Sequence, residues 1–122
     1  MQFDGILISS SDEPVILIKD KNIEYKLSSP ERLILLCLLE NENELMTYEY
    51  LMQVGWGVSS SSAKASLSVS VCNLRRYLKY SNFRIVTVRK EGYLLSHVGM
   101  QYGLIRRLIK RIISRFSQLI YK

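Results

Sequence analysis

The strongest constraint on the fold of this chain is a helical pattern followed by two short strand patterns, all within residues 63–96. At about 100° per residue, four large apolar side chains of the pattern over residues 63–80 fall on one narrow stripe. They are Leu67, Val71, Leu74 and Leu78. Such a stripe is typical of a helix that packs on a core. The sequences FRIVTV and GYLLS follow, joined by Arg89-Lys90-Glu91, and they predict a hairpin over residues 83–96.

The opposite face of the predicted helix is slim and hydrogen-bonding. Apart from a valine and an arginine, its residues are small or polar: Ala65, Ser66, Val69, Cys72, Asn73 and Arg76. Residues 64–90 hold seven Lys or Arg and no Asp or Glu. A helix with an anchored back and a slim front fits a DNA major groove. The alternative is a surface helix with a solvated basic side, but a helix followed by a basic hairpin favours DNA binding.

Four pieces of the sequence carry a resemblance to a known family. Leu74-Arg75-Arg76-Tyr77-Leu78 follows a pattern LRxxL, and residues 85–93 follow I-x-T-V-R-x-x-G-Y. Upstream, Leu27-Ser28-x-x-Glu31 and the run ending in Trp56-Gly57 come in the matching order. The chain therefore resembles the OmpR/PhoB-type winged helix-turn-helix domain over residues 5–96. Because no receiver domain is found in the sequence, the ToxR/CadC-like branch resembles it more than response regulators do.

The resemblance implies an α+β fold and a function. The expected fold has an N-terminal antiparallel sheet, a three-helix core and a C-terminal β-hairpin wing. The expected function is a sequence-specific, DNA-binding transcription regulator. Its recognition helix, residues 63–80, would enter the major groove, and its wing, residues 83–96, the minor groove.

Length and charge divide the chain into one domain, residues 1–97, and a tail, residues 98–122. The net charge of +6 belongs entirely to the tail, which holds six basic residues and no acidic ones. Residues 1–97 hold 11 of each sign, with the acids mostly before residue 50 and the bases mostly after residue 63. This distribution predicts a domain with one basic end.

The sequence gives no indication of an enzyme or of a cofactor. Cys37 and Cys72 lie far apart, and His97 is the only histidine, so no zinc site can be assembled. No nucleophile–base pair or phosphate-binding glycine loop is present. Cys37 is expected to be buried, whereas Cys72 lies near the DNA-facing side. With no signal-peptide pattern at the N-terminus, we expect the cytoplasm.

Local signals predict the elements before the recognition helix. Strands are expected at residues 5–9, 15–19 and 22–27, separated by turn-forming residues. Ser28 and Glu31 form a capping box for a buried helix, and Thr47 can cap a second helix over residues 48–54. Residues 58–62 are expected to be an exposed polar loop. In the family this loop can contact RNA polymerase or a partner.

Several side chains are candidates for DNA contacts. Asn73 can bond adenine N6 and N7, and Val69 can contact a thymine methyl group. The resemblance places Arg89 in a minor groove, which is narrow and attractive to arginine in A·T-rich DNA. Trp56 is expected either near the sugar-phosphate backbone or in the core. The full predicted set is Trp56, Lys64, Ser66, Val69, Ser70, Asn73, Arg75, Arg76, Thr87, Arg89, Lys90 and Tyr93.

The tail reads as a basic amphipathic helix from residue 104 onward. Five of its apolar residues follow a 4-3-4-3 spacing that suits a helix–helix seam: Ile105, Ile109, Ile112, Phe116 and Leu119. Homodimerisation or docking on a partner regulator is the first interpretation. Packing on its own domain is the second, and binding to an anionic membrane surface is the third. An apolar tail also supports an alternative function, in which the chain is a protein-interaction module that modulates another regulator.

Overall fold

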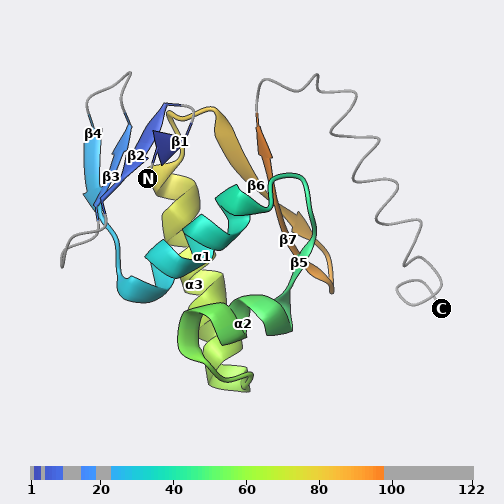
Figure 1. Ribbon diagram of the computed structural model, residues 1–122. Coiled ribbons are helices and arrows are strands. Elements are labelled where there is room, and N and C mark those ends of the chain that lie inside the picture. Colours follow the sequence, from blue (N-terminus) through green and yellow to red (C-terminus); the bar gives the residue numbers. More distant parts are fainter. Residues whose placement is uncertain (1, 4, 10–14, 19–22, 98–122) are drawn as a thin grey trace.

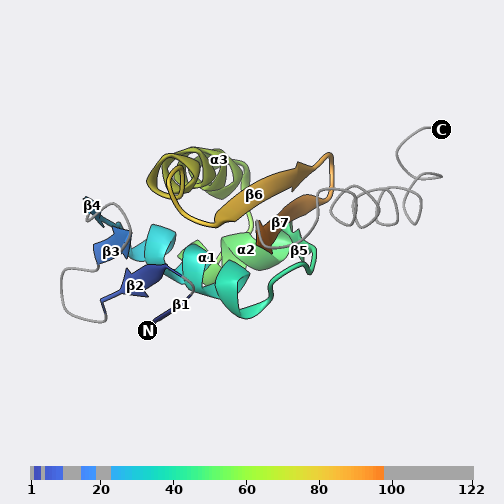
Figure 2. The ribbon, with the colours of Figure 1, turned by 90° about the horizontal axis from the view of Figure 1, so that it is seen from above.

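The computed structural model describes residues 2–3, 5–9, 15–18 and 23–97. Within these residues, an N-terminal sheet, three helices and a C-terminal sheet follow one another, with one short strand between the first two helices (Figure 1). The two sheets lie on opposite sides of the helices, as Figures 1 and 2 show. The predicted α+β winged-helix architecture is confirmed. The amphipathic C-terminal helix and its five seam residues lie outside the described residues.

The N-terminal sheet is antiparallel, with strands in the order β1-β2-β3-β4. The strands are β1 (Gln2–Phe3), β2 (Ile6–Ile8), β3 (Val15–Ile18) and β4 (Ile23–Lys26). β2 and β3 alternate in burial, as expected for a half-buried sheet: Ile6 and Ile18 are paired and buried, whereas Leu7 is exposed. Three of the strands were predicted, with ends one or two residues longer. The short β1 was not predicted.

The first helix is the centre of the core. α1 (Ser29–Glu40) begins with the predicted capping box, in which Ser28 Oγ accepts from the Glu31 N–H and Glu31 Oε1 accepts from the Ser28 N–H. Ile34, Leu35 and Leu38 of α1 are fully buried. Leu33 is exposed, so the helix is buried on most of its circumference but not all.

The second helix is bounded by a cap and a glycine, and a short strand precedes it. β5 (Met46–Thr47) precedes α2 (Tyr48–Trp56), and Thr47 Oγ1 accepts from the Tyr50 N–H, as predicted. Gly57 ends α2 in the left-handed conformation, with φ of 73°. The helix is two residues longer than expected, because Trp56 completes its last turn.

The third helix is the predicted recognition helix. α3 (Ser61–Tyr77) is capped by Ser60, whose Oγ accepts from the Ala63 N–H. The helix begins two residues before the expected range of 63–80, because two of the loop serines belong to its first turn, and it ends three residues before the end of that range. All four residues of the predicted apolar stripe are buried: Leu67, Val71, Leu74 and Leu78. At the end of α3, Tyr77 stacks on Tyr25 of β4, with ring centroids 4.8 Å apart.

The wing is a hairpin of β6 (Phe83–Val88) and β7 (Gly92–His97), and β7 also pairs with β5. The turn between its strands holds Lys90 at φ of 67°. Gly92 faces Thr47 across the β5–β7 pair, and a Cβ at Gly92 would lie 2.0 Å from the Met46 carbonyl oxygen. The close approach of two backbones therefore requires glycine at this position.

Candidate nucleic-acid interface

The face of α3 that points away from the core is open to solvent. Val69 is 61% exposed, which is a high fraction for a large apolar side chain on a helix. Lys64, Ser66, Cys72 and Arg76 are exposed beside it. An exposed valine among small polar residues leaves a slim surface that a base edge can approach. The predicted division of α3 into an anchored back and a slim front is confirmed.

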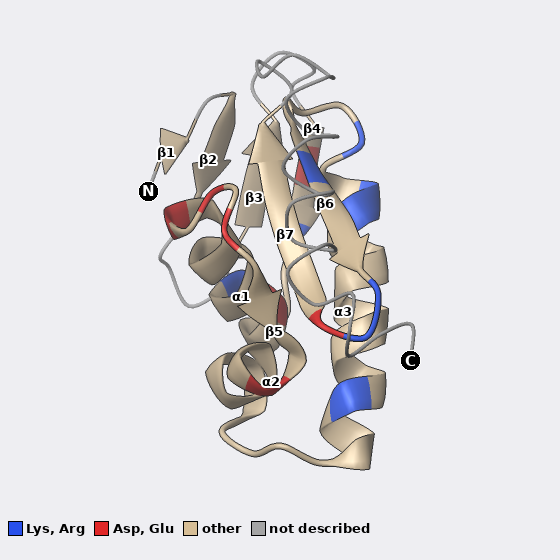
Figure 3. Ribbon diagram, turned by 90° about the vertical axis from the view of Figure 1, so that its right-hand side faces the viewer, with Lys and Arg blue, Asp and Glu red and all other residues tan. Residues whose placement is uncertain are grey.

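Charges of opposite sign are concentrated in different parts of the molecule (Figure 3). Apart from Lys26 on β4 and Arg32 on α1, the described Lys and Arg lie along α3, just after it, on β6 and in the turn between β6 and β7, whereas Asp and Glu lie mostly on α1, on α2 and in the loop between them. One acidic residue, Glu91, also lies in the wing turn, directly after Arg89 and Lys90 in the sequence. This separation gives the α3–wing side a positive potential, which favours an anionic partner.

One groove runs along the front of α3. We call it the α1–α3 groove; its volume is about 440 Å³, and it is lined by Ser28, Pro30, Glu31, Trp56, Ala65, Ser66, Val69, Ser70 and Asn73. Trp56 is half-buried, packs against the core and lines this groove at the same time. The expected packing of Trp56 on the core is therefore confirmed, whereas its position near the sugar-phosphate backbone stays a prediction.

Asn73 is held by a residue of another helix. Its Nδ2 donates to Glu31 Oε2 over 2.9 Å, and Glu31 is only 5% exposed. Because the other oxygen of Glu31 accepts from the Ser28 N–H, one carboxylate joins the cap of α1 to the front of α3. The side chain of Asn73 thus has a defined orientation before any ligand binds.

Arg75 connects α3 to the wing. Its Nε donates to the Ile85 carbonyl oxygen over 3.1 Å, and its guanidinium donates to Thr87 Oγ1 over 2.6 Å. The guanidinium also lies 5.9 Å from the ring centroid of Tyr93. Arg75 was predicted to contact phosphate, but in this structure its donors fix β6 against α3.

A pair of tyrosines completes the contact between the helices and the wing. Tyr48 of α2 and Tyr93 of β7 pack edge to face, with centroids 5.5 Å apart, and Lys64 of α3 lies 5.0 Å from the Tyr48 ring. Burial is the largest influence on the Tyr93 hydroxyl and raises its pKa. The tyrosine therefore remains a neutral part of the packing between α3 and β7.

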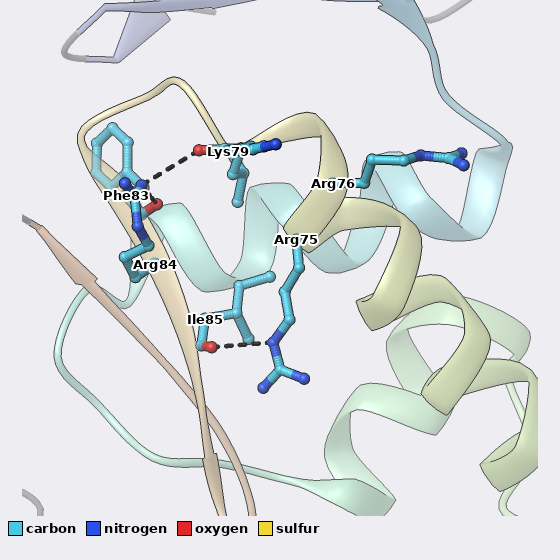
Figure 4. A pocket seen from close by; sticks show the side chains of 7 residues that line it. Arg75, Arg76, Lys79, Phe83, Arg84 and Ile85 are labelled. Atoms are coloured by element: carbon cyan, nitrogen blue, oxygen red, sulfur yellow. Dashed lines mark hydrogen bonds between the residues drawn. The ribbon is translucent and has the colours of Figure 1, made fainter.

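A second hollow, the α3–β6 pocket, lies behind the C-terminal end of α3 (Figure 4). It measures about 420 Å³ and is lined by Arg75, Arg76, Leu78, Lys79, Phe83, Arg84 and Ile85. Arg84 donates to the carbonyl oxygens of Leu78, Ser81 and Phe83, which caps the end of α3. Figure 4 shows Arg75 reaching towards Ile85, whereas Arg76 points away from β6.

Two predicted contact residues are less accessible than expected. Ser70 is 7% exposed, because it lies between the front of α3 and the apolar stripe. Tyr93 is 8% exposed, because its ring packs against Tyr48 between the helices and the wing. Ser70 nevertheless lines the α1–α3 groove, and the DNA contacts expected of both side chains stay predictions. Thr87 is exposed, but its hydroxyl accepts from Arg75.

The remaining predicted contact residues of the wing lie at its tip. Arg89 and Lys90 are exposed in the turn between β6 and β7. The surface that the structure brings together therefore consists of the front of α3, with Lys64, Ser66, Val69, Asn73 and Arg76, and the wing tip, with Arg89 and Lys90.

Two residues with contacts around α3 were not predicted in that role. Glu31 was assigned only to the cap of α1, although its second oxygen, once buried, needs a donor. Arg84 was not singled out at all. Only Glu31 carried a detectable signal, because a capping box leaves one carboxylate oxygen without a partner.

Both cysteines lie where the sequence suggested. Cys37 is buried on α1, and burial raises the pKa of its thiol, whereas Cys72 is exposed on α3. Among the described residues, no group of three His, Cys, Asp or Glu side chains could hold a metal ion. In the same part of the chain, no helix is both long enough and apolar enough to cross a membrane.

Several known structures have the same arrangement. The C-terminal domain of the nisin resistance regulator NsrR, a lantibiotic response regulator, is 27% identical, with a TM-score of 0.60; the match covers 78% of this chain and 95% of that domain. The Klebsiella pneumoniae RstA DNA-binding domain, solved in complex with the RstA box, is 23% identical, with a TM-score of 0.62 and coverages of 79% and 95%.

The DNA-binding domain of the response regulator AdeR, solved in complex with an intercistronic region, is 20% identical, with a TM-score of 0.61 and coverages of 80% and 99%. At the identities of RstA and AdeR, the likeness establishes the winged-helix fold alone. A comparison with curated protein sequences found no match.

The sequence itself matches a family model. Residues 22–95 match the family described as "Transcriptional regulatory protein, C terminal". The match extends from β4 through the three helices into β7, the second strand of the wing. The chain therefore belongs to this family of OmpR/PhoB-type DNA-binding domains of transcription regulators, which are not enzymes. The resemblance inferred from the four sequence pieces is confirmed, whereas the ToxR/CadC-like branch stays a prediction.

Proposed function

We propose that this domain binds double-stranded DNA with α3 in the major groove and the tip of the wing in an adjacent minor groove, and thereby regulates transcription. The observation that carries the proposal is the shared side of α3 and the wing tip, which is basic and has a slim polar front (Figure 3). Domains of the same fold, those of AdeR and RstA, are in complex with DNA. Because its partner is chromosomal DNA, the proposed location is the cytoplasm.

The proposed contacts differ in what they contribute. Val69 and Asn73 are at the centre of the exposed front and would contact base edges. Lys64, Ser66 and Arg76 lie around them and would contact phosphates, which set affinity and register rather than sequence. Arg89 and Lys90 would enter the minor groove, where A·T-rich DNA attracts cations most strongly.

The wing contributes in a second way, through its attachment to α3. Arg75, Thr87 and Tyr93 belong to that attachment, so they would act by holding the wing tip at a fixed distance from α3. The angle between a recognition helix and a wing decides whether both can reach neighbouring grooves of one duplex. Trp56 would support the floor of the α1–α3 groove, beside the sugar-phosphate backbone.

The domain boundary at residues 97–98 and the role of the tail rest on the sequence. We propose that residues 98–122 form a separate basic segment that mediates homodimerisation or docks on a partner regulator. The support is the run of Ile105, Ile109, Ile112, Phe116 and Leu119 at seam spacing, with basic residues between them.

Titration of labelled duplexes tests the DNA-binding proposal. The full chain is measured on A·T-rich and G·C-rich fragments at two salt concentrations, and Arg76→Ala is the comparison variant. Sequence-preferring, salt-dependent binding is expected, and loss of Arg76 should lower affinity on all sequences and flatten the salt slope by about one unit. Equal, negligible binding to every fragment would reject the proposal.

A second candidate function is a protein-interaction module that modulates another regulator. It is favoured by one observation: two of the arginines on α3 and β6, Arg75 and Arg84, use their donors inside the protein. The front of α3 therefore displays few free cations for phosphate. Sedimentation of the full chain and of residues 1–97 would detect self-association through the tail.

The exposed loop before α3 is the proposed contact for RNA polymerase.

A further inference from the structure

The inference concerns the buried carboxylate behind the front of α3. Glu31 is at the third position of α1, and both of its oxygens are engaged: Oε1 accepts from the Ser28 N–H and Oε2 accepts from Asn73 Nδ2, each over 2.9 Å. The two residues of the second bond are 42 positions apart in the sequence. At 5% exposure, Glu31 has little contact with water that could compete for these bonds.

A carboxylate can only accept hydrogen bonds, whereas a side-chain amide has one accepting and one donating end. Asn73 must therefore turn its nitrogen towards Glu31. Its Oδ1 is then left on the other side of the amide, and one N–H of Nδ2 remains after the bond to Glu31 is made. Because Asn73 lines the open α1–α3 groove, these are the groups it can present to a ligand.

We propose that Glu31 is a specificity-determining residue that fixes Asn73 in the orientation that accepts hydrogen bonds from bases. This inference rests on the proposed function, in which the front of α3 faces the major groove. In that groove, adenine and cytosine present an amino group, N6 or N4, whereas guanine and thymine present a carbonyl oxygen, O6 or O4. Asn73 held by Glu31 selects the amino-bearing bases. Adenine comes first, since its N7 can also accept the remaining N–H.

The capping box alone does not require a carboxylate at position 31, but the orientation of Asn73 does. Glutamine at position 31 could also cap α1, because its carbonyl oxygen can accept from the Ser28 N–H. Its NH2 group would then face Asn73 as a donor. Asn73 would turn by 180° about its amide, bond through Oδ1 and present its nitrogen to the groove. The pair would then select guanine or thymine, which carry acceptors.

The first test uses the natural sequence. Duplexes bound by the full chain are selected from a randomised pool, and the same selection is done with Asn73→Ala. The position whose base preference disappears in the Asn73→Ala protein is the one that Asn73 contacts. Adenine or cytosine should be preferred there by about tenfold in the natural protein. A preference for guanine or thymine at that position would overturn the assignment.

The second test exchanges the orientation. Glu31→Gln should shift the preference at that one position towards guanine or thymine, again by about tenfold, and leave the other positions unchanged. In the double variant with Asn73→Ala, Glu31→Gln should have no effect on that position. This control separates an effect through Asn73 from a general change in the α1 cap, and thermal unfolding of each variant verifies that the domain is folded.

The outcomes separate the inference from the function on which it rests. If the natural chain shows no sequence preference at all, the proposed function and the inference are both rejected. If it selects sites and Glu31→Gln selects the same sites, the orientation by Glu31 is rejected while the proposed function remains. If Glu31→Gln does not fold, the first test alone decides whether Asn73 has the proposed orientation: adenine or cytosine at its position supports it, and guanine or thymine rejects it.

Discussion

The two hollows beside α3 differ in the way their polar groups are used. The α1–α3 groove is lined by neutral polar groups and one buried carboxylate, and it is on the side where the front of α3 is exposed. The α3–β6 pocket is lined by four basic residues around an apolar floor. A count of charges would assign the ligand to the second hollow.

The contacts suggest otherwise. In the α3–β6 pocket, Arg84 caps α3 and Arg75 attaches β6, so both guanidinium groups have protein partners. In the α1–α3 groove, one hydrogen bond orients Asn73 and leaves its accepting oxygen available. Basic residues beside α3 can therefore serve the architecture, whereas our proposal assigns the selectivity to a neutral residue, Asn73.

The largest effect is expected from the backbone contact that holds the wing. Gly92→Ala should lower the free energy of unfolding by about 3 kcal/mol or more, because its Cβ would overlap the Met46 carbonyl of β5. Gly55→Ala is the matched control: its Cβ would lie 3.3 Å from the flexible end of Ile34, and alanine favours a helix. Chemical denaturation measures both. If Gly92→Ala and Gly55→Ala have equal free energies of unfolding, the close approach of β5 and β7 does not require glycine at position 92.

Arg75 distinguishes attachment of the wing from contact with phosphate. Arg75→Ala should cost about 1–2 kcal/mol of stability, because it removes bonds to Ile85 and Thr87. It should also weaken DNA binding. Arg75→Lys keeps the charge but cannot make both bonds, so it should resemble Arg75→Ala in stability. If the lysine variant instead keeps full stability and affinity, Arg75 acts as a simple cation.

Arg89 tests the minor-groove contact at the exposed tip of the wing. Arg89→Ala should weaken binding most on sites with a central or flanking A·T tract, by roughly tenfold, since such tracts have narrow, strongly negative minor grooves. Binding curves on matched A·T-rich and G·C-rich flanks make the measurement. A loss of the same size on both would remove the groove preference. The stability should be unchanged, in contrast to Arg75→Ala.

The smallest effect is expected at Lys90, which occupies the left-handed region at φ of 67°. Lys90→Gly should stabilise the domain by about 0.5–1 kcal/mol, because glycine adopts this conformation without a Cβ penalty. Lys90→Ala removes the same charge and keeps the strain, so it serves as the control. Similar DNA affinity of these two variants, both below the natural protein, would assign the loss to the charge.

Much of the fold follows from short-range signals in the sequence. The capping box of Ser28 and Glu31, the cap at Thr47 and the stripe of Leu67, Val71 and Leu74 predicted three helices correctly. The start of α3 was missed by two residues, because every serine in the run before it is a possible cap. β5 was missed because a two-residue strand has no periodicity; it exists only through its pairing with β7.

The candidate site was predicted as a surface but not as a set of contacts. Helical periodicity alone decides which residues of α3 face outward, so Val69, Asn73 and Arg76 were placed correctly on the front. The burial of Ser70 and Tyr93 depends on how closely α1 and the wing approach α3. Such distances come from packing, which a local pattern does not contain.

The sequence by itself determined the family, the order of the helices and of the longer strands, and the basic character of the α3–wing side, because caps, periodicity and charge runs are properties of neighbouring residues. Only the tertiary structure decided the partners of the polar side chains. Glu31 and Asn73 are 42 residues apart, and Arg75 reaches Thr87 on another element. Hydrogen bonds need donor and acceptor within about 3 Å, and that proximity arises only when α1, α3 and the wing pack together.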